Sequence, residues 1–81
     1  MTAARHPSRA TVLVIEDDEE TRRVLTRALA ARGYRTVEAP DGRTALERWE
    51  TSRPDILLLD LGLPDMEGIR LVRQFRRRLD R

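Results

Sequence analysis

The sequence predicts an α/β fold in which three strands and three helices alternate as βαβαβα around a doubly wound parallel sheet. Two short apolar runs, residues 12–15 and 56–59, are typical of strands that are covered on both faces. A further run, residues 35–39, alternates polar and apolar side chains as a half-exposed strand does. Helical periodicity follows each run, so right-handed crossovers with short connections favour the spatial strand order 2-1-3.

The first half of the chain contains a predicted strand at Thr11–Ile15 and a predicted helix at about residues 19–32. Asp18 is the expected N-cap, because its carboxylate can accept a hydrogen bond from an amide of the first turn. Gly33 is expected to end the helix. The apolar stripe predicted to face the sheet consists of Val24, Leu25, Ala28 and Leu29.

The second half of the chain repeats this order of elements. After the edge strand at residues 35–39, the turn Pro40-Asp41-Gly42 leads into a helix at about residues 43–51. A third strand is predicted at residues 55–59, and a third helix runs from about residue 67 almost to the last residue. The predicted packing residues are Ala45, Leu46 and Trp49 in the second helix, and Ile69, Val72, Phe75 and Leu79 in the third.

Length and composition place these elements in one small domain. The chain has 81 residues, of which residues 1–10 lack periodicity and are predicted to form a flexible leader, leaving residues 11–81 as the domain. Cysteine is absent, which excludes disulfides and thiol chemistry and fits a reducing compartment. No apolar run approaches the ~20 residues that a membrane span requires. We therefore expect a cytoplasmic protein with no membrane contact.

The charge pattern gives little support to nucleic-acid binding. All 16 basic residues are arginine, and they are scattered among 14 acidic residues, for a net charge of +2. Only Arg76-Arg77-Arg78 forms a run, which is more typical of the solvated face of a terminal helix than of a phosphate-binding patch. We expect no direct DNA binding by this chain.

Carboxylates stand at the ends of two of the predicted strands. Glu16, Asp17 and Asp18 follow the first strand, and Asp60 follows the third. Neighbouring parallel strands end at one sheet edge, so these groups would converge there and repel one another unless a cation compensates. Magnesium prefers such oxygen ligands, and a carboxylate beside it can act as an acceptor nucleophile. The alternative, that Glu16 and Asp18 are only helix-capping charges, is equally favoured for each taken singly.

The motifs of this chain resemble the first two-thirds of a response-regulator receiver domain from two-component signalling, which has a flavodoxin-like fold. They are the strand and acidic run of residues 12–18, the Arg22-Arg23 helix, residues 38–42, and residues 55–68, and the similarity covers about residues 11–79. Residues 60–65, Asp-Leu-Gly-Leu-Pro-Asp, are most similar to the OmpR-like DNA-binding regulators.

The resemblance implies a role for each residue at the acidic edge. Asp60 would be the phosphoacceptor, taking a phosphoryl group from a phosphohistidine of a sensor histidine kinase. Mg²⁺ would be held by Asp17 directly, by Glu16 through water, by Asp60 and by the backbone carbonyl of Gly62. Asp18 falls one place beyond the acidic pair and is not assigned to the metal. Such a domain is a signalling phosphoacceptor and not a conventional enzyme, although its own residues could catalyse the phosphotransfer.

The chain also departs from the family pattern. A complete receiver has five strands, and we expect strands four and five, with their switch Ser or Thr and their Lys, to be missing here; the chain contains no lysine at all. Phosphotransfer would then be impaired, and the bare apolar edge of residues 56–59 would favour self-association. Two alternatives stay open, a nonfunctional remnant and an interaction module that docks a kinase without phosphotransfer, through its exposed strand or its arginine-rich helix. The first helix, along which kinases contact receivers, is also intact.

Overall fold

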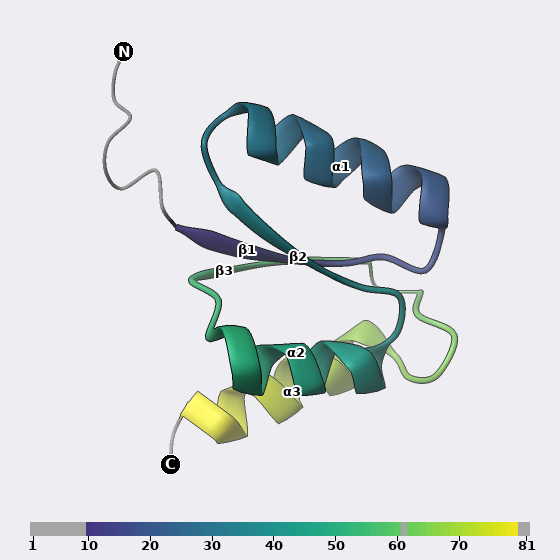
Figure 1. Cartoon of the computed structure of the whole chain (residues 1–81). Helices are drawn as coiled ribbons and strands as arrows, with labels where there is room; N and C mark the ends of the chain where they lie inside the picture. Colours follow the sequence, from purple (N-terminus) through teal and green to yellow (C-terminus); the bar gives the residue numbers. More distant parts are fainter. Residues whose placement is uncertain (1–9, 61, 80–81) are drawn as a thin grey trace.

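The computed structural model describes residues 10–60 and 62–79, and it contains the predicted βαβαβα order (Figure 1). The described elements are β1 (Thr11–Ile15), α1 (Glu19–Ala31), β2 (Arg35–Ala39), α2 (Gly42–Ser52), β3 (Ile56–Leu59) and α3 (Gly68–Leu79). The strands form one parallel sheet in the order β2-β1-β3. The predicted fold class and strand order 2-1-3 are therefore confirmed.

The register of the sheet brings the ends of all three strands to one edge. Ile15 at the end of β1 pairs with Ala39 of β2 on one side and with Leu59 of β3 on the other. The β1 side chains from Val12 to Ile15 are at most 2% exposed, because this central strand is covered on both faces. Any side chain that directly follows β1 or β3 thus emerges at the same carboxyl edge.

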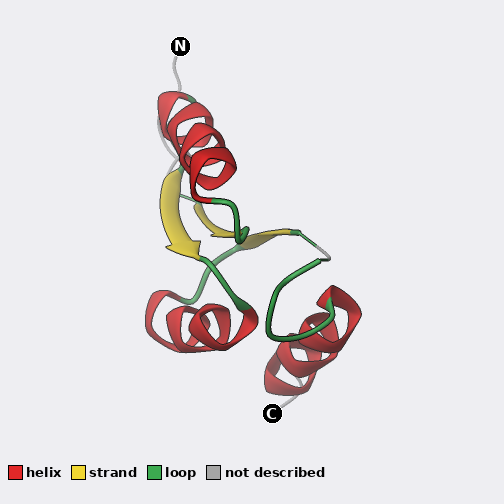
Figure 2. Cartoon of the chain, turned by 90° about the vertical axis from the view of Figure 1, so that its right-hand side faces the viewer, coloured by secondary structure: helices red, strands yellow, loops and turns green. Residues whose placement is uncertain are grey.

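Helices cover the two faces of the sheet unequally. Helix α1 lies on one face, and α2 and α3 lie on the other (Figures 1 and 2). The core lies between the sheet and the α2/α3 pair, where the rings of Trp49 and Phe75 stack at a tilt with centroids 5.9 Å apart. The buried members of this core are Leu13, Ile15, Ala39, Ala45, Trp49, Leu63, Leu71 and Phe75. The predicted packing role of Trp49 is confirmed.

The predicted apolar stripe of α1 is partly wrong. Val24 is 65% exposed and Ala28 is exposed, whereas Leu25 and Leu29 are half-buried beside the buried Thr26. The covered face of α1 runs through Leu25, Thr26 and Leu29, and Val24 and Ala28 lie about 100° away from Leu25 and Leu29 on the outer side of that face. The sequence offers both members of the pairs 24/25 and 28/29 as apolar, and packing selects the second.

The predicted stripe of α3 needs a similar correction. Phe75 is buried as expected, but Ile69, Val72 and Leu79 are 57%, 41% and 69% exposed. Their places in the core are taken by Gly68 and Leu71, which share a helix face with Phe75 at i+7 and i+4. In this rotation of the helix, the ring of Phe75 contacts that of Trp49 in α2.

Strand β3 lies at the edge of the described sheet and is only partly covered. Ile56, Leu57 and Leu58 are 43%, 37% and 39% exposed. Within residues 10–60 and 62–79, no helix is long and apolar enough to cross a membrane. The predicted leader lies outside the described residues except for Ala10, so the boundary between leader and domain stays a prediction.

Candidate functional site

Three carboxylates converge at the carboxyl edge of the sheet. Glu16 and Asp17 follow β1, Asp60 follows β3, and one oxygen from each lies within 4.8 Å of the others. The ladder between the strands continues one step past β3, because the amide of Asp60 donates to the carbonyl of Ile15 at 2.9 Å. This bond holds the Asp60 backbone beside Glu16, so the convergence follows directly from the strand register.

Glu16 is the most constrained of the three acids. Its amide donates to the carbonyl of Ala39 at 3.0 Å, and its side-chain Oε2 accepts from the amide of Asp18 at 3.0 Å. The Asp18 amide lowers the pKa of Glu16, but partial burial and the carboxylates of Asp17 and Asp60 outweigh it, and the pKa is raised. Desolvation is the largest cause that raises this pKa, and the part that comes from Asp17 and Asp60 reflects neighbouring carboxylates, whose repulsion a cation would relieve.

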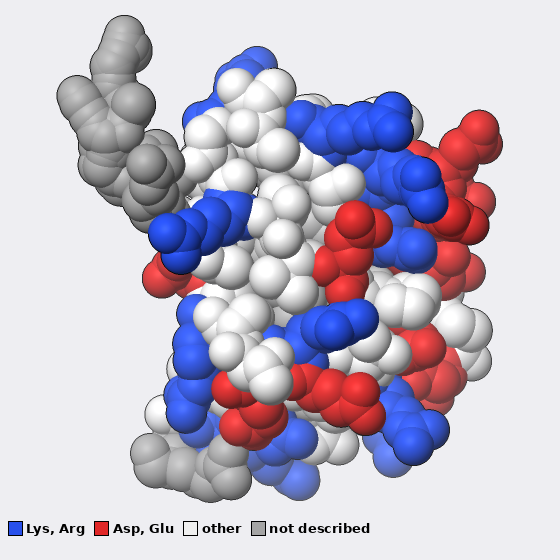
Figure 3. Space-filling view, viewed as in Figure 1, with Lys and Arg blue, Asp and Glu red and all other residues white. Residues whose placement is uncertain are grey.

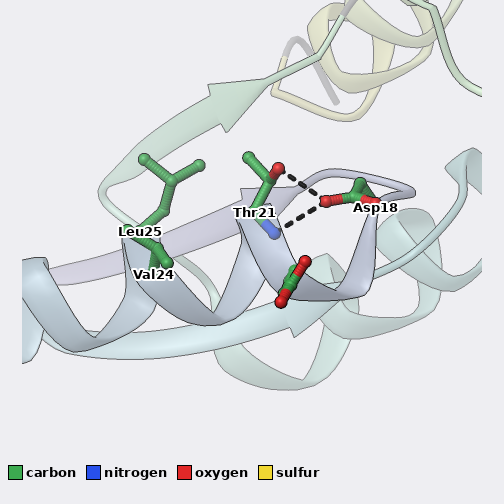
Figure 4. A pocket seen from close by; sticks show the side chains of 5 residues that line it. Asp18, Thr21, Val24 and Leu25 are labelled. Atoms are coloured by element: carbon green, nitrogen blue, oxygen red, sulfur yellow. Dashed lines mark hydrogen bonds between the residues drawn. The ribbon is translucent and has the colours of Figure 1, made fainter.

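Asp18 belongs to helix α1 and not to the acidic cluster. Its Oδ2 accepts hydrogen bonds from both the amide and the hydroxyl of Thr21, at 2.8 and 2.6 Å (Figure 4). The Thr21 hydroxyl, followed by the Thr21 amide, holds the pKa of Asp18 below its usual value. The predicted N-cap role is therefore confirmed.

Arg22 holds the acidic loop, residues 16–18, against the sheet and helix, a role that the sequence prediction missed. Its side chain is 14% exposed and donates from Nη1 to the backbone carbonyl of Glu16 and from Nε to Glu38 Oε1, both at 2.9 Å. One guanidinium therefore ties α1 to the end of β1 and to β2. The sequence signal for this role was that Arg22 lies on the same helix face as Leu25 and Leu29, which is half-buried.

The segment after Asp60 helps to orient its carboxylate. The amide of Gly62 donates to Asp60 Oδ1 at 3.1 Å, and Leu63 is buried in the core at 8% exposure. Gly62 therefore lies beside Asp60, while the predicted role of its carbonyl as a metal ligand stays a prediction. Asp65, three residues further on, bonds to the start of α2 and was not singled out from the sequence.

The donor set of this cluster is suited to a hard divalent cation. Glu16, Asp17 and Asp60 offer only carboxylate oxygens, at separations that one ion can bridge. Elsewhere, on the face seen in Figure 3, arginine and acidic side chains are interspersed and do not form one basic patch. The expectation that the chain does not bind DNA stays a prediction.

Comparison with known proteins identifies related chains. Residues 12–81 match the family described as "Response regulator receiver domain". The transcriptional regulator KdpE of the KDP operon in Escherichia coli is 43% identical over 65 residues, which cover 80% of this chain and 29% of KdpE. The regulatory protein PhoP of Bacillus subtilis, named for alkaline phosphatase synthesis, is 38% identical over 80% of this chain and 27% of its own. The chain thus spans less than a third of these relatives.

Solved structures agree with the sequence comparison. The chemotaxis response regulator CheY4 of Vibrio cholerae superposes with a TM-score of 0.81 at 32% identity, covering 84% of this chain and 57% of CheY4. The BeF3-activated receiver domain of RstA from Klebsiella pneumoniae gives a TM-score of 0.77 at 32% identity, over 82% of this chain and 56% of RstA's. The sheet that gathers Glu16, Asp17 and Asp60 at one edge thus has the receiver fold, and the chain belongs to the receiver-domain family of two-component response regulators.

Proposed function

We propose that this chain is a phosphoacceptor module that receives a phosphoryl group from a sensor histidine kinase on Asp60, with Mg²⁺ at the acidic cluster. The observation that carries the proposal is the approach of the Glu16, Asp17 and Asp60 carboxylates to within 4.8 Å of one another. Membership of the receiver family supports it, because this family acts in two-component signalling. We place the protein in the cytoplasm, where a kinase and its phosphohistidine would be available.

The chemistry is an in-line phosphoryl transfer. One Asp60 carboxylate oxygen forms a bond to phosphorus while the bond from phosphorus to the kinase imidazole nitrogen breaks, and the electron pair of that bond stays on the imidazole. Mg²⁺, when bound, supplies positive charge against the phosphoryl oxygens. Asp17 would bind the ion directly and Glu16 through water, while the Gly62 amide, 3.1 Å from Asp60 Oδ1, fixes the rotation of the acceptor carboxylate.

A second candidate function is kinase docking without phosphotransfer. A hollow along the exposed side of α1 is lined by Asp18, Glu20, Thr21, Val24 and Leu25 (Figure 4). Val24 is 65% exposed there, which leaves apolar surface available to a partner. A histidine kinase that binds Asp60→Asn as tightly as the parent, but loses binding to Val24→Asp, would favour docking. Absence of both binding and phosphorylation would favour a nonfunctional remnant.

The proposal is tested by phosphorylation of the purified chain with acetyl phosphate, read by intact mass. We expect one phosphoryl group per chain in the presence of Mg²⁺ and none after chelation. Asp60→Asn should abolish labelling, because the amide is not a nucleophile of this kind. The matched control is Asp55→Asn at the opposite end of β3, where Asp55 Oδ2 accepts from the amide of Thr11 at 2.8 Å. Equal labelling of parent and Asp60→Asn would contradict the proposal.

A further inference from the structure

The loop between β3 and α3 is fastened to the start of helix α2 by one side chain. Asp65 Oδ1 accepts from the amide of Gly42 at 2.8 Å, and Asp65 Oδ2 accepts from the amide of Arg43 at 2.9 Å. Figure 1 shows this loop beside the connection from β2 to α2. Both carboxylate oxygens are thus used to join segments that lie 23 and 22 residues apart in the sequence.

Helix α2 has a local N-cap of its own. Asp41 Oδ1 accepts from the amide of Thr44 at 2.7 Å, which is the usual arrangement for an N-cap aspartate. Asp65 satisfies two other amides of the first turn, which have no partner within the helix. Desolvation raises the pKa of Asp65, but the Gly42 and Arg43 amides outweigh it, and the pKa is lowered. The negative form that makes both bonds is therefore favoured at neutral pH.

Two further contacts press the same loop against the body of the protein. A Cβ atom added at Gly42 would lie 2.7 Å from both Cγ and Sδ of Met66, so the loop packs directly on the helix backbone. Leu63 is buried in the core at 8% exposure. The loop is consequently held at Leu63, Asp65 and Met66, immediately after the residue that contacts Asp60.

We propose that Asp65 is a positioning residue for the acceptor site, which acts by clamping residues 62–66 to the N-terminus of α2. This inference rests on the proposed function, because it is Gly62 that donates to Asp60 Oδ1 and would lend its carbonyl to Mg²⁺. A loop ordered before the ion arrives does not have to lose its conformational freedom on binding. Without the clamp, that loss would weaken binding of the metal and slow the reaction of Asp60.

Asp41 and Asp65 form a matched pair for the test. Both carboxylates cap α2, so Asp41→Ala and Asp65→Ala should each lower thermal stability, but only Asp65→Ala removes hydrogen bonds that hold the loop. We would titrate Mg²⁺ into ¹⁵N-labelled chain, follow the Gly62 amide signal, and record its heteronuclear NOE without metal. Asp65→Asn retains one acceptor oxygen and serves as the partial rescue if the alanine variant does not fold.

We expect Asp65→Ala to raise the Mg²⁺ Kd roughly three- to tenfold, the scale of one ordinary net hydrogen bond, and Asp41→Ala to change it by less than about twofold. Asp65→Asn should lie between parent and alanine. Equal Kd values for the two alanine variants, or for parent and Asp65→Asn where the alanine variant is unfolded, would overturn the inference.

The metal-free NOE separates this inference from the proposed function. A parent chain that does not bind Mg²⁺ would refute the proposed function, and the clamp would then be judged by loop order alone. A lowered Gly62 NOE in Asp65→Ala, or in Asp65→Asn if needed, with an unchanged value in Asp41→Ala supports the clamp. An unchanged Gly62 NOE in all variants refutes it.

Discussion

Single side chains at this site act mainly by holding backbone in place. Arg22 bonds to the backbone carbonyl of Glu16 and to Glu38, and the Gly62 amide bonds to the Asp60 carboxylate, so the backbone of Glu16 and the side chain of Asp60 are held by groups that are not themselves acidic. Asp60 comes directly after β3 and faces the cluster, whereas Asp18 is the third residue after β1 and caps a helix. The chemical identity of a carboxylate near a strand end therefore does not decide its role; its place relative to the end of the strand does.

At the residue scale, Arg22→Ala should destabilise the fold more than Arg23→Ala does. Arg22 is nearly buried and makes two bonds to oxygen acceptors, so its loss should lower the free energy of unfolding by about 1–3 kcal/mol. Arg23 makes an exposed i,i+4 pair with Glu19, and Arg23→Ala should cost below about 0.5 kcal/mol. Urea denaturation measures both. Equal costs for the two variants would show that Arg22 does not support the acidic loop.

At the element scale, the sequence predicts where helices lie more reliably than which way they face. Strand runs, caps and turns are local signals, and they correctly placed all six elements of the described chain. Helix rotation depends on partners that the local sequence does not contain. Apolar residues stand at neighbouring positions of α3, 71 and 72, and packing against the rest of the core buries Leu71 while Val72 is 41% exposed.

The corrected face of α3 can be tested with a pair of truncations. Leu71 is fully buried and Ile69 is 57% exposed, although the sequence stripe favoured Ile69 as a packing residue. We expect Leu71→Ala to lower the free energy of unfolding by about 2–5 kcal/mol and Ile69→Ala by under about 1 kcal/mol. Thermal or urea unfolding gives the comparison. A larger cost for Ile69→Ala would restore the original stripe and contradict the packing described above.

At the scale of the whole molecule, strand β3 contributes both to the candidate site and to the exposed edge of the sheet. The side of β1 that pairs with β3 brings Asp60 to the cluster, while the outer side of β3 leaves Ile56, Leu57 and Leu58 between 37% and 43% exposed. The convergence of acids could be predicted because the strand register alone sets it. The Arg22–Glu38 and Asp65 contacts could not be, because they join side chains to segments 16 to 23 residues away that no strand register aligns.

Self-association through β3 stays a prediction of this arrangement. An apolar edge strand can pair with the same strand of a second copy, and a charge placed on it opposes that pairing. We expect the chain to sediment as a concentration-dependent mixture, and Leu58→Lys to shift it toward monomer. Val24→Lys, a similar charge added to exposed apolar surface on α1, is the control and should leave the distribution unchanged. A monodisperse parent monomer would contradict the prediction.

The claim that Glu16, Asp17 and Asp60 form one cation site is tested most directly by paramagnetic mapping. Mn²⁺ also takes carboxylate oxygens, and it broadens the NMR signals of amides near it. In ¹⁵N-labelled chain we predict that amides at the ends of β1 and β3 broaden first, that excess Mg²⁺ reverses this, and that Asp17→Asn weakens it strongly. Broadening centred on Glu19 and Glu20, or unchanged in Asp17→Asn, would show that the three carboxylates do not act as one site.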